Sequence, residues 1–211
     1  DVAFTNNFPS HGDQIQVLAM VRNMESLPTG QFKVRFYDNI WTKVIGEVQL
    51  SLSPLQTNVV MIPWNTTGGN HTIHVFADSD YIVNELNESN NEGVKSIYVN
   101  RIPILATPVS MVVDENEPLT LQINASDLDN DTLTFYTNAD VVIPSPFSFD
   151  SATGVFQWTP NYGDRGQYIV TFNVTDGRAW DIENVTIDVN VVSGGGSPFF
   201  MKAAQQLLRQ F

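Results

Sequence analysis

Residues 119–135 read LTLQINASDLDNDTLTF, two alternating runs around an acidic centre. Leu119, Leu121 and Ile123 share one face of the first run, and Leu133 and Phe135 share one face of the second. This period of two is typical of β-strands. The centre, 127–131, reads Asp-Leu-Asp-Asn-Asp and has the composition of a turn. Two strands joined by a polar turn favour an all-β fold.

The same turn is a candidate cation site. Asp127, Asp129 and Asp131 place three carboxylates within five residues, and they repel one another unless a cation or solvent separates them. Calcium takes about six to eight oxygen ligands and suits such a loop. We expect calcium here, with a solvated acidic turn as the alternative. An EF-hand is excluded, because the required Gly and the closing Glu are missing.

Length and charge limit the classes of function. The 211 residues suffice for two domains of about 100 residues each. Residues 1–100 carry 5 basic and 10 acidic side chains, and residues 101–193 carry 3 and 13. Such a negative field opposes nucleic acid and anionic lipid, so neither is expected as a partner. The sequence has no Cys, no signal peptide and no membrane-length apolar run, which favours a mature or excised fragment without thiol chemistry.

Seven N-x-Ser/Thr triplets indicate the compartment. In the predicted strands, Asn124, Asn173 and Asn184 lie on the face opposite the apolar residues, where a glycan could be attached. Coincidence in a β protein rich in Asn and Thr is the alternative. We expect an extracellular or cell-surface glycoprotein. The triplets begin at Asn65, Asn70, Asn87, Asn124, Asn130, Asn173 and Asn184.

The first half predicts about seven short strands separated by turn residues. Alternating runs cover 14–22, 32–37, 44–50, 57–64, 72–77 and 94–99. No segment between them has the length of a sizeable helix. The pattern predicts an immunoglobulin-like sandwich over residues 1–100.

Two parts of this half resemble a known family. The lead-in Gly12-Asp13 and the ending 83–92, which contains Asn-Glu-Ser-Asn-Asn, resemble the CARDB domain, a cell-adhesion-related module of bacterial and archaeal surface proteins. The family's Asn-x-Gly turn is replaced by Asn-Met-Glu at 23–25. The resemblance implies a non-catalytic surface module. A second cation is expected in the oxygen-rich run that follows residue 77, with an Asx-turn network as the alternative. Its expected ligands are Asp78, Asp80, Glu85 and Asn90.

The second half predicts another β domain over residues 101–192. The stretch 101–108 contains two prolines and is expected to be an extended joint. Residues 147–160 predict a hairpin, in which Gly154 occupies the position that needs a positive φ. Further strands are predicted over 168–174 and 183–192, after a tight turn at 175–178.

This half resembles cadherin-like, dystroglycan-type and "putative Ig" repeats of surface proteins. The matching segments are 127–133, 149–160, 166–168 and 175–177. The resemblance implies a seven-stranded Greek-key sandwich with calcium held by Glu117, Asp127, Asp129 and Asp176. We expect Glu115 and Glu117 to meet the Asp127 loop and Asp176 at one end of the sandwich, where the cation would stiffen the joint.

The tail has two parts. Residues 193–197, Ser-Gly-Gly-Gly-Ser, predict a flexible linker. Residues 198–211 begin with Pro198 at a first helical position and carry an apolar stripe, Lys202, Arg209 and no acid. A helix this short is marginal alone and must dock on its own sandwich, a neighbouring copy, a partner or a membrane surface. An engineered fusion is the alternative to a native assembly element.

Catalytic patterns are absent from the sequence. His71 and His74 are three residues apart and fall on opposite faces of a strand, so they make no zinc pair, and His11 stands alone. No nucleophile elbow, phosphate loop or dinucleotide fingerprint occurs. We therefore expect no enzyme. Stacking of sugars on exposed Trp is the remaining binding chemistry. The candidates are Trp41, Trp64, Trp158 and Trp180, of which Trp158 is expected in the core.

Together these features predict two tandem immunoglobulin-like sandwiches in an adhesive or structural protein. We expect a spacer, or a subunit of a surface fibre or layer, stiffened by calcium. The expected partners are other copies or neighbouring surface proteins, reached through 198–211, with glycans as further ligands. The alternative is a carbohydrate-binding accessory module of a secreted enzyme.

Overall fold

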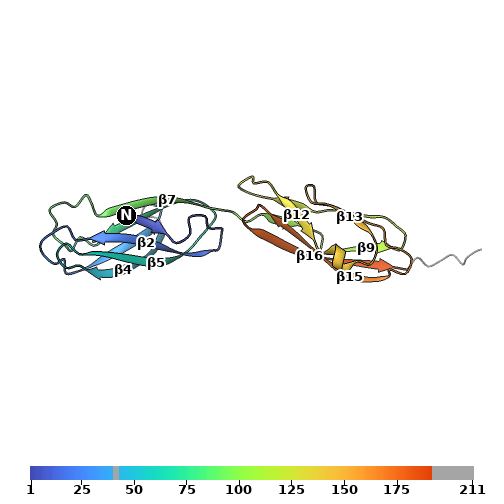
Figure 1. Ribbon diagram of the computed structural model, residues 1–211, viewed down its shortest axis with the longest axis horizontal. Coiled ribbons are helices and arrows are strands. Elements are labelled where there is room, and N and C mark those ends of the chain that lie inside the picture. The colour runs from blue at the N-terminus through green and yellow to red at the C-terminus, as the bar shows by residue number, and fades with distance from the viewer. Residues whose placement is uncertain (40–42, 192–211) are drawn as a thin grey trace, which may run out of the picture. The chain divides into compact units, whose positions relative to one another are not determined.

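The structure, a computed structural model, describes residues 1–39 and 43–191, and its secondary structure is almost entirely β (Figure 1). The chain folds into two compact units. The first consists of Asp1–Ile102 together with Asp127–Asp131, and the second of Pro103–Ser126 together with the chain from Thr132 onward. Each unit has a hydrophobic core of its own.

The first unit is a sandwich of two antiparallel sheets. One sheet has the order β1-β2-β5 and the other the order β4-β3-β6-β7. The strands are β1 (Val2–Phe4), β2 (Gln14–Arg22), β3 (Gln31–Asp38), β4 (Lys43–Ser51), β5 (Thr57–Asn65), β6 (Gly69–Ala77) and β7 (Glu92–Val99).

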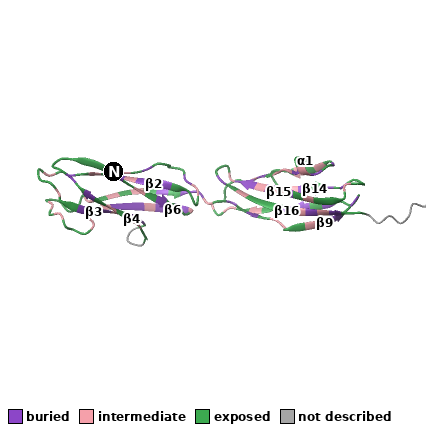
Figure 2. Ribbon diagram, turned by 90° about the horizontal axis from the view of Figure 1, so that it is seen from below, coloured by how far each residue is buried: buried purple, intermediate pink, exposed green. Residues whose placement is uncertain are grey.

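Alternation along these strands builds the first core. Val17, Val34, Phe36 and Ile73 are fully buried in the first core, and buried residues alternate with less buried ones along most of β2 and the first part of β3. Figure 2 colours the chain by this burial. Each fully buried side chain contributes about 1.5–3 kcal/mol through burial. Because a shift of one residue would expose the whole apolar set, the alternation also fixes the register. That register pairs Gln14 with Asn65 and Arg22 with Thr57.

Up to residue 191, the second unit contains nine strands and one helical turn, α1 (Ala139–Val142). Its sheets have the orders β10-β14-β13, β11-β8 and β12-β15-β16-β9. The strands are β8 (Ile104–Ala106), β9 (Ser110–Asp114), β10 (Leu119–Gln122), β11 (Asn124–Ser126), β12 (Thr134–Thr137), β13 (Phe147–Asp150), β14 (Val155–Trp158), β15 (Gly166–Thr175) and β16 (Trp180–Asn190).

Two local expectations differ from the structure of this unit. The run 119–125 is not one strand, because the chain changes sheet at Ile123: β10 pairs with β14, whereas β11 pairs with β8. Part of the expected joint is itself a strand, since Ile104–Ala106 forms β8. Neither difference disturbs the alternation, and Ile123 remains fully buried.

The second core is centred on aromatic residues. Phe156 and Phe172 are fully buried and meet edge to face, with ring centroids 5.6 Å apart. Trp158 is 2% exposed, as predicted, and its Nε1–H donates to Ser145 Oγ at 2.7 Å. The buried indole thus keeps its one polar atom satisfied.

These sheets form two immunoglobulin-like sandwiches, and the predicted all-β fold class is confirmed. The predicted linker 193–197, the predicted helix 198–211 and Trp41 lie outside the described residues. Within the described residues, no helix is long and apolar enough to cross a membrane.

The hairpin β13–β14 yields a test of the fold. Gly154 has φ +71°, and a Cβ there would lie 2.5 Å from the Ile123 carbonyl oxygen. Gly177 also has a positive φ, +88°, but a Cβ there meets nothing within 4 Å. Gly154→Ala should therefore destabilise the protein by about 2 kcal/mol more than Gly177→Ala, because it adds a clash to the shared backbone strain. Thermal and denaturant unfolding measure the difference, and equal losses would contradict the described packing.

Candidate functional site

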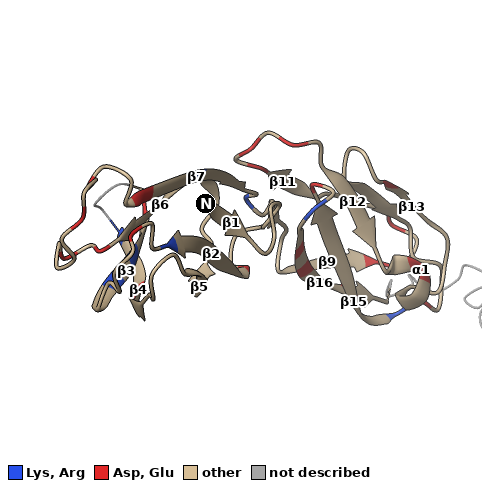
Figure 3. Cartoon of the chain, turned by 60° about the vertical axis from the view of Figure 1, so that its left-hand side comes forward, with Lys and Arg blue, Asp and Glu red and all other residues tan. Residues whose placement is uncertain are grey.

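Acidic side chains in the connections between strands bind backbone N–H groups. Many of the residues drawn red in Figure 3 lie on such connections. Of the 23 acidic residues in the sequence, ten accept a hydrogen bond from a backbone N–H within the part of the chain that the structure describes. They are Asp13, Asp78, Glu88, Glu115, Asp127, Asp129, Asp150, Asp164, Asp176 and Asp181.

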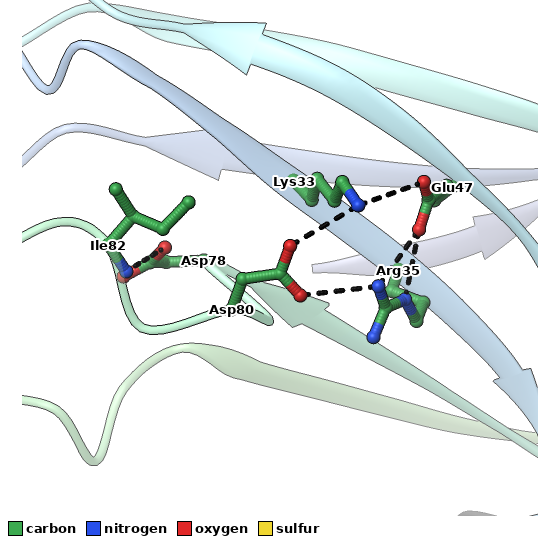
Figure 4. Close-up of polar contacts among 6 residues, drawn as sticks. All are labelled: Lys33, Arg35, Glu47, Asp78, Asp80 and Ile82. Atoms are coloured by element: carbon green, nitrogen blue, oxygen red, sulfur yellow. Dashed lines mark hydrogen bonds and ion pairs between the residues drawn. The ribbon is translucent and has the colours of Figure 1, made fainter.

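Asp78 is the most complete example. It is 2% exposed, and its two carboxylate oxygens accept from Ile82 N and Val83 N, both at 2.9 Å (Figure 4 draws the Ile82 bond). Its carbonyl oxygen accepts from Tyr81 N, which closes the turn. Since both carboxylate oxygens already accept hydrogen bonds from backbone N–H groups, the role of Asp78 is to stabilise the turn. This is the Asx-turn alternative considered for this run.

Asp80 faces a different part of the first unit. Its carboxylate pairs with Lys33 at 3.3 Å and with Arg35 at 3.2 Å, and both of these also pair with Glu47 (Figure 4). Hydrogen bonds from Arg35 and then Lys33 hold the pKa of Glu47 below its ordinary value. The four expected ligands of the second cation are thus divided: Asp78 braces a turn, Asp80 joins this ion-pair network, and only Glu85 and Asn90 line the same cavity.

That cavity is a concave feature of the first unit. It has a volume of about 520 Å³ and lies between the connection 22–29 and the segment 83–93. Buried apolar side chains, among them Ala19, Phe32, Leu52 and Val75, form its floor. A volume of this size is in the range of small-ligand pockets. We call it the distal pocket, because Val99, where the chain leaves β7, pairs with Gly69 at the other end of the β6–β7 ladder.

Glu85 is the perturbed group of the distal pocket. Burial raises its pKa, and the charges of Glu88, Asp78 and Glu25 raise it further, although a hydrogen bond from Asn91 Nδ2 partly offsets them. Sequence reasoning missed Glu25 and the exposed Met24. The only signal for them was the departure from the family turn at 23–25. The shared Asn23 shapes this loop, because its buried amide donates to the carbonyl oxygens of Leu27 and Ser53.

The triad predicted at 127–131 is brought together. Asp127, Asp129 and Asp131 each offer a carboxylate oxygen, and these oxygens lie within 4.8 Å of one another. Asp127 Oδ1 accepts from Asp129 N at 2.7 Å and from Asp131 N at 3.4 Å. Asp127 Oδ2 is buried and has no hydrogen-bond partner among the described residues. Such an orphan oxygen, beside the exposed Asp131, fits a hard cation.

Asp129 is already neutralised within the same unit. Its Oδ1 receives Arg101 Nη1 at 2.6 Å and its Oδ2 receives Arg101 N at 2.7 Å. Burial alone would raise the pKa of Asp129, but hydrogen bonds from Tyr98 and Arg101 outweigh burial and hold the pKa below its ordinary value. The triad therefore offers a cation mainly Asp127 Oδ2 and Asp131.

The remaining predicted ligands lie far from Asp176. Strand β9 runs parallel to β16, so Asp114 pairs with Asn190, whereas Thr175, next to Asp176, pairs with Trp180 at the other end of β16. The 11 residues of β16 span about 33 Å. Glu115 and Glu117 follow Asp114, so they cannot share one cation with Asp176, and the expected single cluster at one end of the sandwich is corrected. Glu115 instead accepts from Gly163 N at 2.8 Å, while its buried Oε2 has no hydrogen-bond partner among the described residues.

The sequon asparagines differ in access. Asn173 is half-buried on β15, and its Oδ1 is buried without a hydrogen-bond partner among the described residues. The other six are exposed. They are Asn65, Asn70, Asn87, Asn124, Asn130 and Asn184.

The histidines of β6 are structural. His71 Nδ1 lies 2.7 Å from Asp38 Oδ1 and its Nε2 lies 2.6 Å from the Thr67 carbonyl oxygen. His74 Nδ1 lies 2.6 Å from Glu92 Oε1. Both rings are buried, and their nitrogens contact different oxygen atoms, so the two described histidines form no shared metal site.

An exposed aromatic pair lies on the outer face of the second unit. Trp180 is 51% exposed and Tyr136 is 45% exposed, with ring centroids 5.2 Å apart. The register of β12, β15 and β16 places Ile182 beside them, and it is 57% exposed. Of the other tryptophans, Trp64 and Trp158 are in the cores.

The two units define a class of protein built from immunoglobulin-like domains in series. The family assignments are more specific. Residues 2–95 match the family model of CARDB, and residues 102–192 match that of the "Putative Ig domain". The first unit is thus a CARDB domain and the second a domain of this Ig family. Domains of both kinds are usually extracellular or surface-exposed and are typically non-catalytic.

Among solved structures, the chain is similar to the CARDB domain of a Pyrococcus furiosus protein in complex with di-metal ions, with 24% identity and a TM-score of 0.42 over 46% of this chain and 93% of that one. The ectodomain of mouse nectin-like molecule 4 matches at 10% identity and a TM-score of 0.40 over 93% of this chain and 66% of that one. Fibronectin(III)-like modules of CbhA from Clostridium thermocellum match at 17% identity and a TM-score of 0.30, over 93% and 99%. No curated protein matches the chain.

Proposed function

We propose that this chain is a non-catalytic adhesion or structural module of a secreted or cell-surface protein, which acts as a spacer or as a subunit of a surface fibre or layer. The observation that supports this most is the use of the acidic side chains. Ten of them brace connections by accepting backbone N–H groups, and Asp80 joins a surface ion-pair network. Acidic side chains that hold loops in place suit a structural role and not a catalytic one.

The proposed cofactor is calcium, and the proposed partners are other copies or neighbouring surface proteins, reached through residues 198–211. The candidate calcium ligands are Asp127 and Asp131, with Asp129 next to them. The buried orphan oxygen of Asp127 supports this site, because a bound cation would supply the missing partner. Exposed asparagines at six N-x-Ser/Thr triplets leave room for glycans.

Calcium binding is tested by thermal unfolding of the full chain. Raising calcium from chelated to about 5 mM should increase the Tm of one transition by about 5 °C, given the weak sites usual in extracellular modules. Asp127→Asn and Asp131→Asn should each reduce this increase by at least about half, since each removes one charged ligand. Asp114→Asn removes an exposed acid elsewhere and serves as the control. A Tm that is unchanged by calcium, or a loss of the increase in all three variants, would eliminate the site.

A second candidate function is carbohydrate binding, and the exposed pair Tyr136 and Trp180 favours it. Aromatic faces stack on the apolar face of a sugar ring, and the two rings lie together on a sheet with polar neighbours such as Asn184. This candidate corresponds to an accessory module of a secreted enzyme.

Glycan binding is measured on an array with the full chain. If the second candidate is correct, a hit should weaken at least about tenfold in Trp180→Ala and Tyr136→Ala, because each removes a stacking face. Tyr162→Ala removes an aromatic ring that is 79% exposed elsewhere, and should leave the hit unchanged. An empty array, or a hit equally reduced by all three substitutions, would reject carbohydrate binding by this pair.

A further inference from the structure

The distal pocket combines an apolar floor with an apolar rim. Below the opening lie Phe32, Leu52 and Val75, which belong to the buried core. Around the opening lie large apolar side chains that are exposed: Met24 is 62% exposed, Leu27 73% and Leu86 91%. Flexible Met and Leu side chains gathered around a hollow are typical of surfaces that receive apolar side chains of a partner.

The walls of the pocket are acidic. Glu25 and Glu85 come from the two segments that enclose it, and the charge of Glu25 contributes to the raised pKa of Glu85. Neither carboxylate has an ion-pair partner among residues 1–39 and 43–191. Arg22 is the only Lys or Arg among the residues that line the pocket. An occupant with apolar side chains and positive charge would therefore complement both the floor and the walls.

A segment of this same chain has that composition. Residues 198–211 read PFFMKAAQQLLRQF and contain three Phe, two Leu, one Met, Lys202 and Arg209, with no acidic residue. They follow the Gly-rich stretch 193–197 in the sequence. The rest of the chain is strongly acidic, so the charge of this segment is opposite to that of the remaining sequence.

The proposed assembly function makes a second copy the source of the segment. In the first unit, the distal pocket lies at the end of the β6–β7 ladder away from Val99. In the second unit, Leu105 N donates to Asp181 near the start of β16, so the chain enters at that end and leaves past Asn190 at the other end. When residues 198–211 of one copy bind the first unit of another copy, the two copies use different surfaces. Such a heterologous contact can repeat from copy to copy without closing into a ring.

We propose that residues 198–211 of one copy dock in the distal pocket of the next, with Lys202 and Arg209 against Glu25 and Glu85 and the Phe and Leu side chains over Leu52 and Phe32. This inference rests on the proposed assembly function and names its receiving site. A raised pKa at a cleft-facing carboxyl also occurs in catalytic acids. The apolar floor and the location of both acids on connecting loops favour binding.

The test uses a fluorescent peptide of residues 198–211, titrated by the full chain and followed by anisotropy. Binding should saturate, weaken at least about fivefold in the double variant E25Q/E85Q, and stay unchanged in E183Q, which removes an exposed acid of the second unit. A peptide carrying K202E/R209E should fail to bind the native chain and should recover binding to a chain carrying E25K/E85K. Equal melting curves establish that the variants remain folded.

Sedimentation of the full chain over a range of concentrations measures self-association. It distinguishes docking in the distal pocket from self-assembly through another surface. We expect self-association that rises with concentration and falls in E25Q/E85Q. Self-association that E25Q/E85Q leaves unchanged, or peptide binding that is equal in both chains, would overturn the pocket as the receiving site and leave assembly standing. A chain that stays monomeric while the peptide binds would place its own tail in the pocket and overturn the second copy as the occupant. Absence of both self-association and peptide binding would overturn the inference and the proposed assembly together.

Discussion

The hydrogen bond from a backbone N–H to a side-chain carboxylate is the interaction on which the connections of this protein depend. A sandwich of short strands leaves many N–H groups in its loops without ladder partners, and each needs an acceptor. A bond to a charged acceptor contributes about 1.5–3 kcal/mol, more than a neutral one. Asp78 supplies two such bonds from a buried position, and Asp150 and Asp176 each receive two in tight turns. At Asp150 the bonds from Ala152 N and Thr153 hold the pKa of the carboxyl below its ordinary value.

This use of charge explains how a chain without cysteine and with a net charge of −13 holds its long connections in place. A disulfide would restrict a loop by a covalent cross-link between two parts of the chain. Here, Asp and Glu side chains restrict the loops by hydrogen bonds to backbone N–H groups in individual turns. The arrangement also decides which acids remain for binding. Glu25, Glu85, Asp131 and the buried Oδ2 of Asp127 are not engaged in this way, so the distal pocket and the 127–131 loop each keep carboxylate oxygens for a basic segment or a cation.

Local patterns predicted the fold more completely than the sites. Alternation revealed most strands of both sandwiches, and Gly154 the tight hairpin, because burial and positive φ act on neighbouring residues, but β8 and β9 were not predicted. The three-residue β1 was missed, since so short a strand shows no period. Asp127, Asp129 and Asp131 were predicted together because they are adjacent in sequence. The separation of Glu115 from Asp176 was not predictable, because it depends on β9 pairing parallel to β16. The distal pocket was also missed, since its walls are about 60 residues apart in sequence and meet only after both sheets have paired.

Hydrogen exchange at the backbone amides of Ile82 and Val83 measures whether the Asp78 carboxylate holds its loop in place. In the native protein both amides should exchange at least about tenfold more slowly than in an open loop, because the Asp78 carboxylate holds them. Asp78→Ala should remove this protection. Asp80→Ala, two residues away, should retain it, because Asp80 pairs with Lys33 and Arg35 side chains. Equal protection of the two amides in Asp78→Ala and in the native chain would contradict the account.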